Sequence, residues 1–403
     1  MPRAHQNRSL PNMILTNCAA CAAPLAHDAP RCVRCKTRYC NATCQHDHWR
    51  RGHEDHCRRI KRGGGAEQYH ADNKYEEAVT VAAEACADDT KGQTCYICTE
   101  AFHWKTKEGL VRGCACHTTE GFVHVSCLLE QAKILVAEAE ENNLDDKAMD
   151  ERWELWFACN LCEQGYHGVV RCALGWACWK TYLGRPETDQ VLGLAMSLLA
   201  DGLLKVKNCK GALEVCEVYL DTCRRYPESE DIDETIDIYT IQSNCLSKLG
   251  MHSNALEVDR RAYKLSIEEY GDSASTTFTH ANNLACSLIN LGLYSEAKTL
   301  LYKSLKECIC EHGDEHYTSL RLRETSAQLL YKDPEATEDD LLEAEAMLGG
   351  LVQFSRQRYG ANYPGTVQLQ TFLDRAKLLL KLFRARAARA ASRAVQDAET
   401  PVA

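Results

Sequence analysis

The sequence lacks any apolar run of about 18 residues, the length that a membrane-spanning helix requires. Its first residues, MPRAHQNRSLPN, also lack the long apolar core of a secretory signal peptide. No phosphate-binding loop, dinucleotide fingerprint or catalytic triad can be recognised. We therefore expect an intracellular protein, cytoplasmic or nuclear, with no transmembrane segment and no catalytic residue of its own.

Charge is distributed unevenly along the chain. The formal net charge is −10, yet residues 1–65 carry twelve Lys or Arg against four Asp or Glu. Bound metal would reduce this basic excess, because each thiolate ligand adds a negative charge. A strong electrostatic attraction to nucleic acid is therefore not expected, and we do not predict nucleic acid as a partner.

Cysteine is abundant, with 24 residues, of which 17 precede residue 180. Many stand as C-x2-C pairs, and one such pair lets a single tight turn supply two of the four ligands of a tetrahedral zinc ion. A disulfide framework is the alternative, but disulfide-dense scaffolds are small and secreted. A segment as short as residues 16–60 cannot bury much apolar surface, so bound zinc is expected to provide its stability.

The first ligand series has the order of seven cysteines with one histidine before the last. It comprises Cys18, Cys21, Cys32, Cys35, Cys40, Cys44, His53 and Cys57. With Arg38-Tyr39-Cys40 and Trp49-Arg50-Arg51-Gly52-His53, the series resembles the MYND zinc finger, although the interval before His53 is one residue longer than is usual there. The resemblance implies two zinc ions in an interleaved arrangement, one bound by Cys18, Cys21, Cys40 and Cys44 and the other by Cys32, Cys35, His53 and Cys57.

The resemblance also implies peptide recognition and not catalysis. Tyr39 and Trp49 are then candidate surface aromatics for a proline-rich ligand, with packing against the zinc loops as their alternative role. Three other histidines, His46, His48 and His56, lie nearby, but His53 and Cys57 are four apart and so share one helical face. We therefore expect His53 to be the ligand. After Cys57, a basic run and three glycines predict a hinge, and residues 66–90 have the apolar spacing of a helix.

The second ligand series also has eight members. It comprises Cys95, Cys98, Cys114, Cys116, His124, Cys127, Cys159 and Cys162. Its order of four cysteines, a histidine and three cysteines, with a single residue between Cys114 and Cys116, resembles the RING-CH finger. The resemblance implies one zinc ion bound by Cys95, Cys98, His124 and Cys127 and another by Cys114, Cys116, Cys159 and Cys162.

A RING-type module would act by positioning a ubiquitin-conjugating enzyme, and Ile97 matches the position of the apolar contact to that enzyme. Two departures stand against ligase activity: a long acidic insertion between Cys127 and Cys159, and Glu163 where a basic residue often follows the last ligand. A non-enzymatic adaptor is the first alternative. A PHD-like finger that reads histone tails is the second, although its ligand spacing fits less well.

Beyond Arg185-Pro186 the cysteine pairs end and helical periodicity begins. A shift of 42 residues maps Gly250 onto Gly292 and Ala255 onto Ala297, and a further shift of 47 maps Ala297 onto Ala344. These units resemble the tetratricopeptide repeats of kinesin light chains, and such repeats stack into a solenoid that binds protein segments. Residues 366–395 predict a final amphipathic helix with a basic end.

Together these patterns predict a multidomain protein in which two small zinc-stabilised cross-brace modules precede an all-α tetratricopeptide-like solenoid. The expected ranges are a MYND-like finger over 16–60, a linker and helix over 61–90, a RING-CH-like finger with a helical insertion over 91–185, and helical repeats with a basic C-terminal helix over 187–395. We expect four zinc ions and a scaffold that recruits protein clients through its repeats, with RING-type ubiquitin-protein transfer as the candidate activity.

Overall fold

The computed structural model describes residues 15–26, 28–114, 116, 121–361 and 364–399. Within them the protein is mostly helical, and four isolated bridges are its only β-type pairings. The chain divides into two compact units, Met1–Leu249 and Gly250–Ala403. The finer ranges predicted from the sequence stay predictions.

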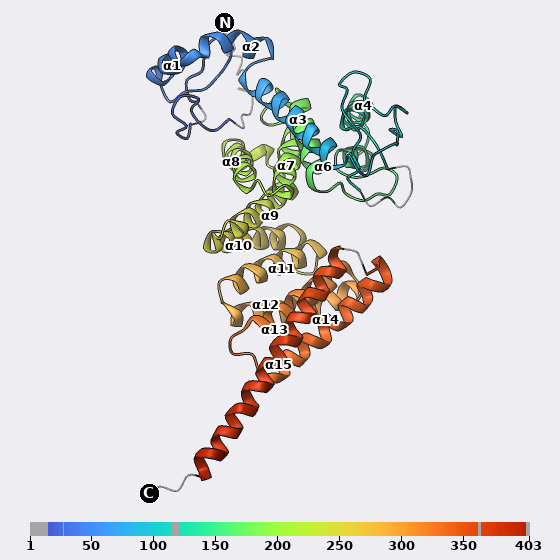
Figure 1. The fold of residues 1–403 in the computed structure, drawn as a ribbon. Helices are drawn as coiled ribbons and strands as arrows, with labels where there is room; N and C mark the ends of the chain where they lie inside the picture. Colours follow the sequence, from blue (N-terminus) through green and yellow to red (C-terminus); the bar gives the residue numbers. More distant parts are fainter. Residues whose placement is uncertain (1–14, 27, 115, 117–120, 362–363, 400–403) are drawn as a thin grey trace. The chain divides into compact units, whose positions relative to one another are not determined.

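The first unit begins with a small module built from loops and two short helices, α1 (Ala42–His48) and α2 (Glu54–Arg62) (Figure 1). Its buried core consists of Tyr39 and four of the predicted ligand cysteines. Such a core supplies little hydrophobic stabilisation. The folded structure of this module therefore depends on a group bound by its cysteines.

The rest of the first unit shares one continuous hydrophobic core. The long helix α3 (Ala66–Ala85) lies within the range 66–90 that the sequence predicted to be helical, and it buries Val79 and Ala82, while Cys86 is buried directly after its end. The helices of this region are α4 (Val125–Glu141), α5 (Asp146–Trp153), α6 (Gly168–Tyr182), α7 (Gln190–Lys205), α8 (Cys209–Arg225) and α9 (Ile232–Lys248). Helix α6 packs against both α3 and α7, so the second cysteine-rich module is joined to the helical body by its core.

The acidic insertion between Cys127 and Cys159 is helical, as predicted. It forms most of α4 and all of α5, and α4 buries Leu128, Leu129 and Val136 on one face. The side chain of Asp145 caps α5 by accepting a hydrogen bond of 2.9 Å from the backbone of Ala148.

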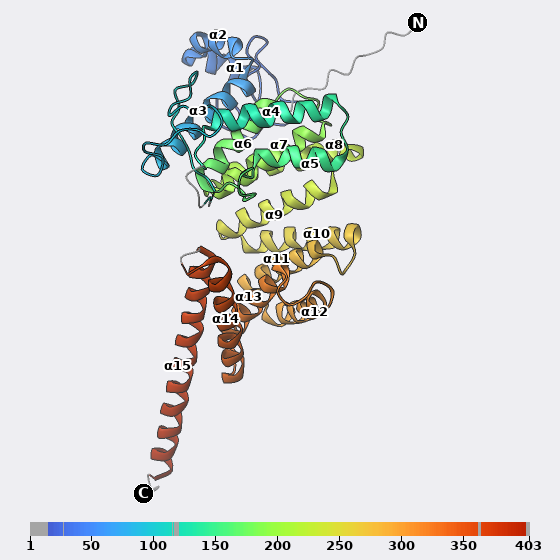
Figure 2. The same cartoon turned by 90° about the vertical axis from the view of Figure 1, so that its right-hand side faces the viewer.

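The second unit is a series of antiparallel helices (Figure 2). They are α10 (His252–Tyr270), α11 (Ser275–Asn290), α12 (Tyr294–His312), α13 (Tyr317–Lys332), α14 (Glu338–Tyr359) and α15 (Pro364–Glu399). Small residues lie where the sequence repeat predicted close packing, since Ala255, Ala297 and Ala344 are fully buried. Helix α15 packs beside α14 through Leu373, Ala376 and Leu380.

Glycines mark the helix ends of the repeat. Gly250 and Gly292 follow α9 and α11 with φ angles of 77° and 74°, a left-handed conformation that favours glycine. The second helices end in the same way, with Gly313 after α12 and Gly360 after α14. The repeat-like helical body expected from the 42-residue periodicity is confirmed. No helix among the described residues is long and apolar enough to cross a membrane.

Candidate metal centres

The sixteen predicted ligand residues come together in four groups of four. Within each group the candidate ligand atoms all lie within 4.8 Å of one another. The groups are Cys18, Cys21, Cys40 and Cys44; Cys32, Cys35, His53 and Cys57; Cys95, Cys98, His124 and Cys127; and Cys114, Cys116, Cys159 and Cys162. The membership matches the interleaved sets that the two resemblances implied. Each group could hold one zinc ion.

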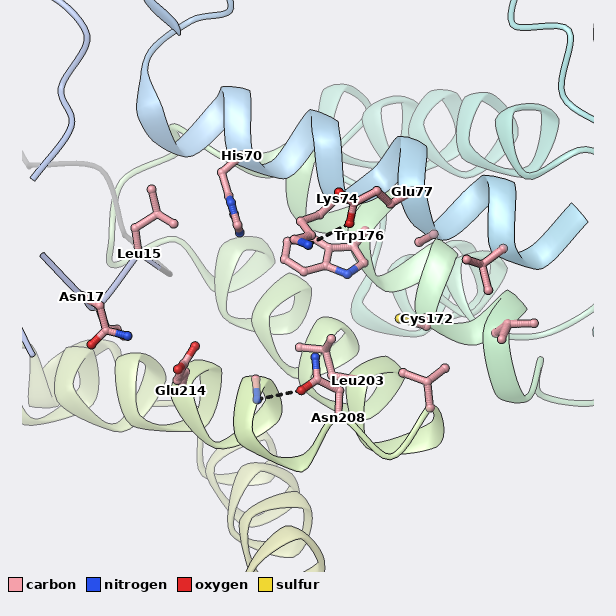
Figure 3. Close-up of a pocket in the computed structure, with 16 residues that line it drawn as sticks. Leu15, Asn17, His70, Lys74, Glu77, Cys172, Trp176, Leu203, Asn208 and Glu214 are labelled. Carbon is pink, nitrogen blue, oxygen red and sulfur yellow. Dashed lines mark hydrogen bonds and ion pairs between the residues drawn. The ribbon is translucent and has the colours of Figure 1, made fainter. Parts of the chain in front are cut away.

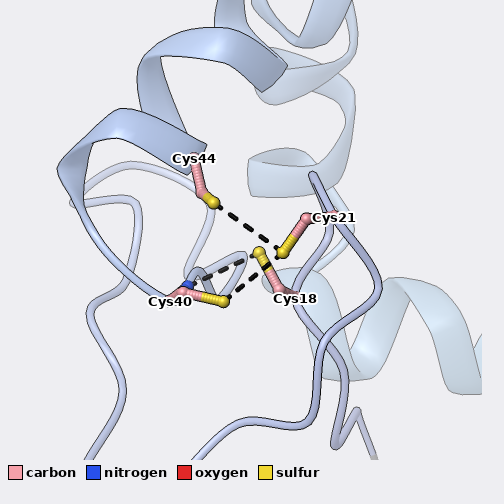
Figure 4. A group of neighbouring side chains, drawn as sticks. All are labelled: Cys18, Cys21, Cys40 and Cys44. Atoms are coloured by element: carbon pink, nitrogen blue, oxygen red, sulfur yellow. Dashed lines mark hydrogen bonds between the residues drawn. The ribbon is translucent and has the colours of Figure 1, made fainter.

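The first group lies between two loops and the start of α1 (Figure 4). The Sγ atom of Cys21 lies 3.5 Å from that of Cys40 and 3.8 Å from that of Cys44. A tetrahedron with zinc–sulfur bonds of about 2.3 Å has sulfur–sulfur edges of about 3.8 Å. The spacing of these thiols therefore fits a single tetrahedral ion.

The second group is fully buried and includes the histidine. Nε2 of His53 lies 3.2 Å from Sγ of Cys35, and Sγ of Cys32 lies 3.8 Å from that of Cys57. Because Cys32 and Cys35 precede Cys40 in the chain while His53 and Cys57 follow Cys44, the two groups interlock. Loss of either ion would therefore loosen loops that serve both.

The additional residue before His53 has a structural explanation. Residues Trp49–His53 form a single π-type turn between α1 and α2, and Gly52 within it has a φ of 108°. A π-turn accommodates one more residue than an α-turn. It therefore absorbs the longer interval while His53 and Cys57 keep their four-residue spacing on α2.

The neighbouring histidines do not join the second group. His46 and His56 are exposed, and Nδ1 of His48 lies 3.0 Å from the hydroxyl of Tyr39. Burial lowers the pKa of His48, with smaller contributions from Arg51 and His56, so its ring tends to be neutral. His48 therefore supports the buried Tyr39 side chain rather than a metal.

The other two groups cross-brace the second module. Nδ1 of His124 lies 3.4 Å from Sγ of Cys98 and 3.7 Å from that of Cys127, while its Nε2 lies 3.5 Å from the carbonyl oxygen of Ala101. Metal-binding histidines commonly donate the second ring N–H to a backbone carbonyl in this way. In the fourth group, Sγ of Cys116 lies 3.3 Å from that of Cys114 and 3.7 Å from that of Cys159.

All four C-x2-C pairs share one backbone geometry. In each, the amide of the fourth residue after the first cysteine donates to that cysteine's carbonyl, at 2.7 to 2.9 Å. The donors have positive φ angles and are Ala22, Lys36, Thr99 and Glu163. This tight turn directs both thiols of a pair to one point, as zinc binding requires.

The electrostatics of the groups also favour a bound cation. A hydrogen bond from the Cys127 thiol lowers the pKa of Cys95 to about 4, and the same bond raises the pKa of Cys127 far above its usual range. In the first group, hydrogen bonding to Cys21 raises the pKa of Cys40 to about 12. Like charges this close cannot all ionise unless a cation compensates them. The donor set, three or four thiols with at most one imidazole, is typical of structural zinc.

The predicted partner-binding residues differ in their exposure. Ile97 is 38% exposed in the turn between Cys95 and Cys98. Trp49 is partly buried against the core of the first module. Tyr39 is fully buried, and its hydroxyl is occupied by His48. For Tyr39 the structure therefore shows packing, and not the surface position that a peptide contact would need.

A second exposed apolar side chain, which the sequence did not single out, lies on the turn that adjoins the one with Ile97. Leu161, between Cys159 and Cys162, is 46% exposed. The hydroxyl of Tyr96 donates a hydrogen bond of 3.0 Å to Oδ1 of Asn160, which joins the two turns. Two exposed apolar side chains thus lie on adjoining turns of the second module.

A fifth turn of the same shape also escaped the sequence reasoning, because it contains no cysteine. Lys107 has a φ of 61°, and its amide donates to the carbonyl of His103 at 2.9 Å. The buried His103 ring hydrogen-bonds Thr106 through Nδ1 and lies 5.5 Å from the ring of His124. This turn therefore packs against the third group without adding a ligand to it.

A pocket of about 470 Å³ lies between α3, α6, α7 and α8 in the first unit (Figure 3). Trp176, Leu203 and Val206 contribute apolar surface, and the ion pair of Lys74 with Glu77, at 2.7 Å, lies at its edge. Its volume is typical of small-molecule or side-chain binding sites. The lining residues are separated by up to 200 positions, so no local sequence pattern marks this pocket.

Comparison with known proteins gives no family assignment. No family model matches the chain, and no curated protein matches it. Among solved structures, the crystal structure of BtubC (BKLC) from P. vanneervenii aligns with 69% of this chain and 94% of its own, at 16% identity and a TM-score of 0.39. A similarity of this size establishes neither the fold nor a function.

Proposed function

We propose that this protein is a zinc-binding scaffold for protein interactions. Its first module acts as a MYND-like finger, its second as a RING-CH-like finger, and its helical repeats recruit a protein client. The gathering of all sixteen predicted ligands into four tetrahedrally spaced groups is the observation that supports the proposal. Each ion would fix loops whose own apolar core is too small to order them.

Elemental analysis of a matched pair of variants tests the metal part of the proposal. Cys57→Ala removes a buried ligand of the second group, whereas His56→Ala changes the exposed residue beside it. Full-length protein carrying Cys57→Ala should retain less zinc than wild type, and His56→Ala should retain the wild-type amount. Equal zinc content in all three proteins would contradict the assignment.

Cross-linking of the full-length protein to captured clients tests the recruitment part. If the helical repeats hold the client, cross-links should map mainly to residues 187–395. Cross-links confined to the two cysteine-rich modules would show that recruitment uses the fingers instead. The partly exposed Trp49 is then the residue to substitute first, as the remaining candidate for a peptide contact of the first module.

Ubiquitin transfer is the second candidate function, and the pair of Ile97 and Leu161 favours it. RING-type modules present apolar side chains to a conjugating enzyme, and here two such side chains are exposed on adjoining turns. The contribution of such a module is to hold the charged conjugating enzyme in a reactive orientation. Glu163, directly after the last ligand, stands against this function, because a basic residue often follows the last ligand in RING-type modules.

An in vitro ubiquitination assay with a panel of conjugating enzymes separates ligase from adaptor. Ubiquitin chains should form with wild type and be reduced at least tenfold by Ile97→Ala. Leu144→Ala, which removes an exposed leucine between α4 and α5, is the matched control and should leave the rate unchanged. Absence of chains with every conjugating enzyme would leave the adaptor function alone.

A further inference from the structure

A second cleft, of about 410 Å³, lies within the first unit where the second module meets the helical body. Its walls come from α6, α7, α9 and the segment that follows α5. Apolar surface comes from Trp153, Phe157, Leu198 and Ile241. Its polar lining has three acidic residues and three others, which are Asp201, Glu234, Asp237, Arg171, Ser197 and Thr240.

Glu234 is the unusual member of this lining. Its side chain is only 7% exposed, and its Oε1 atom has no hydrogen-bond partner among the described residues. Ser197 forms a hydrogen bond with the carboxyl group. Leaving a buried carboxyl oxygen unpaired costs free energy, so a polar group supplied from outside would be stabilised there.

The acidic charge of the cleft is only partly compensated from within. Asp201 is paired with Nε of Arg171 at 2.8 Å and with Nζ of Lys205 at 3.3 Å. Asp237, one turn after Glu234 on α9, is exposed and forms no ion pair with any described residue. On one face of α9, Asp237 therefore lacks a counter-charge, and the neighbouring carboxyl group of Glu234 is buried.

The arrangement suits an organic cation better than a metal ion. Among the described residues, only the four cysteine-containing groups bring three or more ligand atoms within metal-binding distance, so the carboxylates of the cleft do not converge. The protein's own Arg171 already binds in the cleft in this way. Its guanidinium lies over the Phe157 ring at 5.0 Å and pairs with Asp201. Aromatic and carboxylate neighbours of this kind are what arginine prefers.

We infer that this cleft binds an arginine or lysine side chain of a partner polypeptide, with the cation between Glu234 and Asp237 and the aliphatic stem against Trp153 and Ile241. The inference deepens the proposed recruitment of a client and rests on it. It adds the chemistry of one contact: the client segment is basic at this point. Charge complementarity selects this occupant, since an acidic or neutral segment would leave Asp237 without a counter-charge and could not stabilise the ionised form of Glu234.

The ionisation of the two carboxyl groups agrees with this role. Burial raises the pKa of Glu234 to about 8, with the nearby Asp237, Asp231 and Asp233 adding to the shift. Limited hydration at the rim and the charge of Asp201 raise the pKa of Asp237 to about 6. A cation placed between the two groups would favour the ionised form of both.

Binding of synthetic peptides to the full-length protein tests the inference. The probes are three fluorescein-labelled dodecapeptides of glycine and serine that contain three arginines, three citrullines or three glutamates. Citrulline keeps the shape of arginine without its charge. Fluorescence anisotropy should show binding of the arginine peptide at least tenfold tighter than that of the citrulline peptide, and none of the glutamate peptide.

Matched variants then locate the site. The double variant Glu234→Gln with Asp237→Asn should weaken binding of the arginine peptide at least tenfold. Asp233→Asn removes one charge from the same helix outside the cleft lining and should change the affinity less than twofold. Circular dichroism should show that all variants stay folded, because the neutral amides preserve the size of the side chains.

Equal losses in the double variant and in Asp233→Asn would overturn the inference, since they would reflect the general acidity of the protein. Binding of the citrulline peptide as tightly as the arginine peptide would also overturn it. If clients cross-link to the repeats but the arginine peptide does not bind, the inference fails alone. If the arginine peptide binds as expected but no client cross-links and no zinc is found, the proposed function fails instead.

Discussion

Arg185 forms two hydrogen bonds with Glu140, Nη1 to Oε1 at 2.7 Å and Nη2 to Oε2 at 2.8 Å. Glu140 belongs to the acidic insertion, near the end of α4, and Arg185 lies between α6 and α7. The guanidinium also lies over the ring of Tyr182 at 4.9 Å. This paired contact joins the inserted helix to the point where the cysteine-rich sequence gives way to helical repeats.

Substituting Glu140 by glutamine should therefore destabilise the first unit. The hydrogen bonds from Arg185 lower the pKa of Glu140, so the ionised form is favoured in the folded protein. Partly buried charge-assisted bonds of this kind contribute about 1–2 kcal/mol. We expect a lower thermal midpoint for Glu140→Gln at pH 7. The difference from wild type should shrink as pH falls below about 4.5 and through the lowered pKa that Glu140 has in the folded protein.

Glu141→Gln is the control for this prediction. Glu141 is the next residue, is exposed and forms no ion pair with any described residue. Its substitution should leave the thermal midpoint nearly unchanged. An equal effect of both substitutions would indicate a general response to charge on α4, and the contact with Arg185 would then contribute nothing specific.

Helices α6 and α7 approach each other through two glycines, and alanine should not be tolerated there. A Cβ atom on Gly175 would lie 2.9 Å from the carbonyl oxygen of Leu198, and one on Gly202 would lie 2.9 Å from Cα of Cys172. Both contacts are with backbone, which cannot rotate away. We expect Gly175→Ala and Gly202→Ala each to cost about 1–3 kcal/mol through overpacking, measured by urea denaturation.

Gly349 in α14 provides the opposite case. No atom of the described residues lies within 4 Å of the position that its Cβ would occupy. Alanine favours the helical conformation over glycine by about 0.5–1 kcal/mol. Gly349→Ala should therefore stabilise the protein slightly. A stabilising effect of Gly175→Ala or Gly202→Ala as well would show that the close contact of α6 and α7 is absent.

The ligand groups and the helical repeat could be predicted from the sequence because both leave short-range or repeating patterns in it. The C-x2-C pairs and the four-residue interval of His53 and Cys57 determine which side chains share a turn. Likewise, the recurrence of Ala255, Ala297 and Ala344 at repeat intervals indicates where two helices pack closely. For the π-turn at Gly52, the sequence showed only that the interval before His53 has one additional residue. The shape of the turn could not be predicted, because it depends on how α1 and α2 meet.

Other features depend on residues far apart in the chain and left no local pattern. From the sequence, Glu234 is an ordinary acidic residue in the first turn of a helix, where a solvent-exposed position would be expected. Only the packing of α7 beside α9 shows that it is buried. Tyr39 reads as a surface aromatic beside a ligand, yet its ring fills the small interior of the first module. The bond between Tyr96 and Asn160 links turns that are 64 residues apart.

Removal of metal should affect the two cysteine-rich modules differently. In the first, the buried core consists of Tyr39 and four ligand cysteines. In the second, the ligands share a core with α3, α4 and α6. Since metal binding and folding are coupled where the core is small, a chelator should abolish amide protection throughout residues 16–60 while α6 and α7 stay protected.

Hydrogen exchange followed by mass spectrometry measures this difference, with zinc restored after chelation as the control for reversibility. Cys178→Ala provides a second control, because Cys178 is fully buried in α6 and belongs to none of the four groups. That variant should keep the wild-type response to the chelator. Full protection of residues 16–60 after complete removal of metal would contradict a structural role for the ion.

The buried carboxyl group of Glu234 should make stability fall as pH rises. Burial raises its pKa from 4.5 to about 8, so between these values the folded protein binds a proton that the unfolded chain has released. The unfolding free energy then decreases with pH over this window. The hydroxyl of Ser197 works against the shift in pKa, whereas Asp231, Asp233 and Asp237 reinforce it.

The variant Glu234→Gln lacks the proton that Glu234 binds in the folded protein. The stability of this variant relative to wild type should therefore increase from pH 5 to pH 8.5. Urea denaturation across this range measures the trend, with the exposed Glu269→Gln as a control that should track wild type. A constant difference between Glu234→Gln and wild type at every pH would mean that burial does not raise the pKa of Glu234.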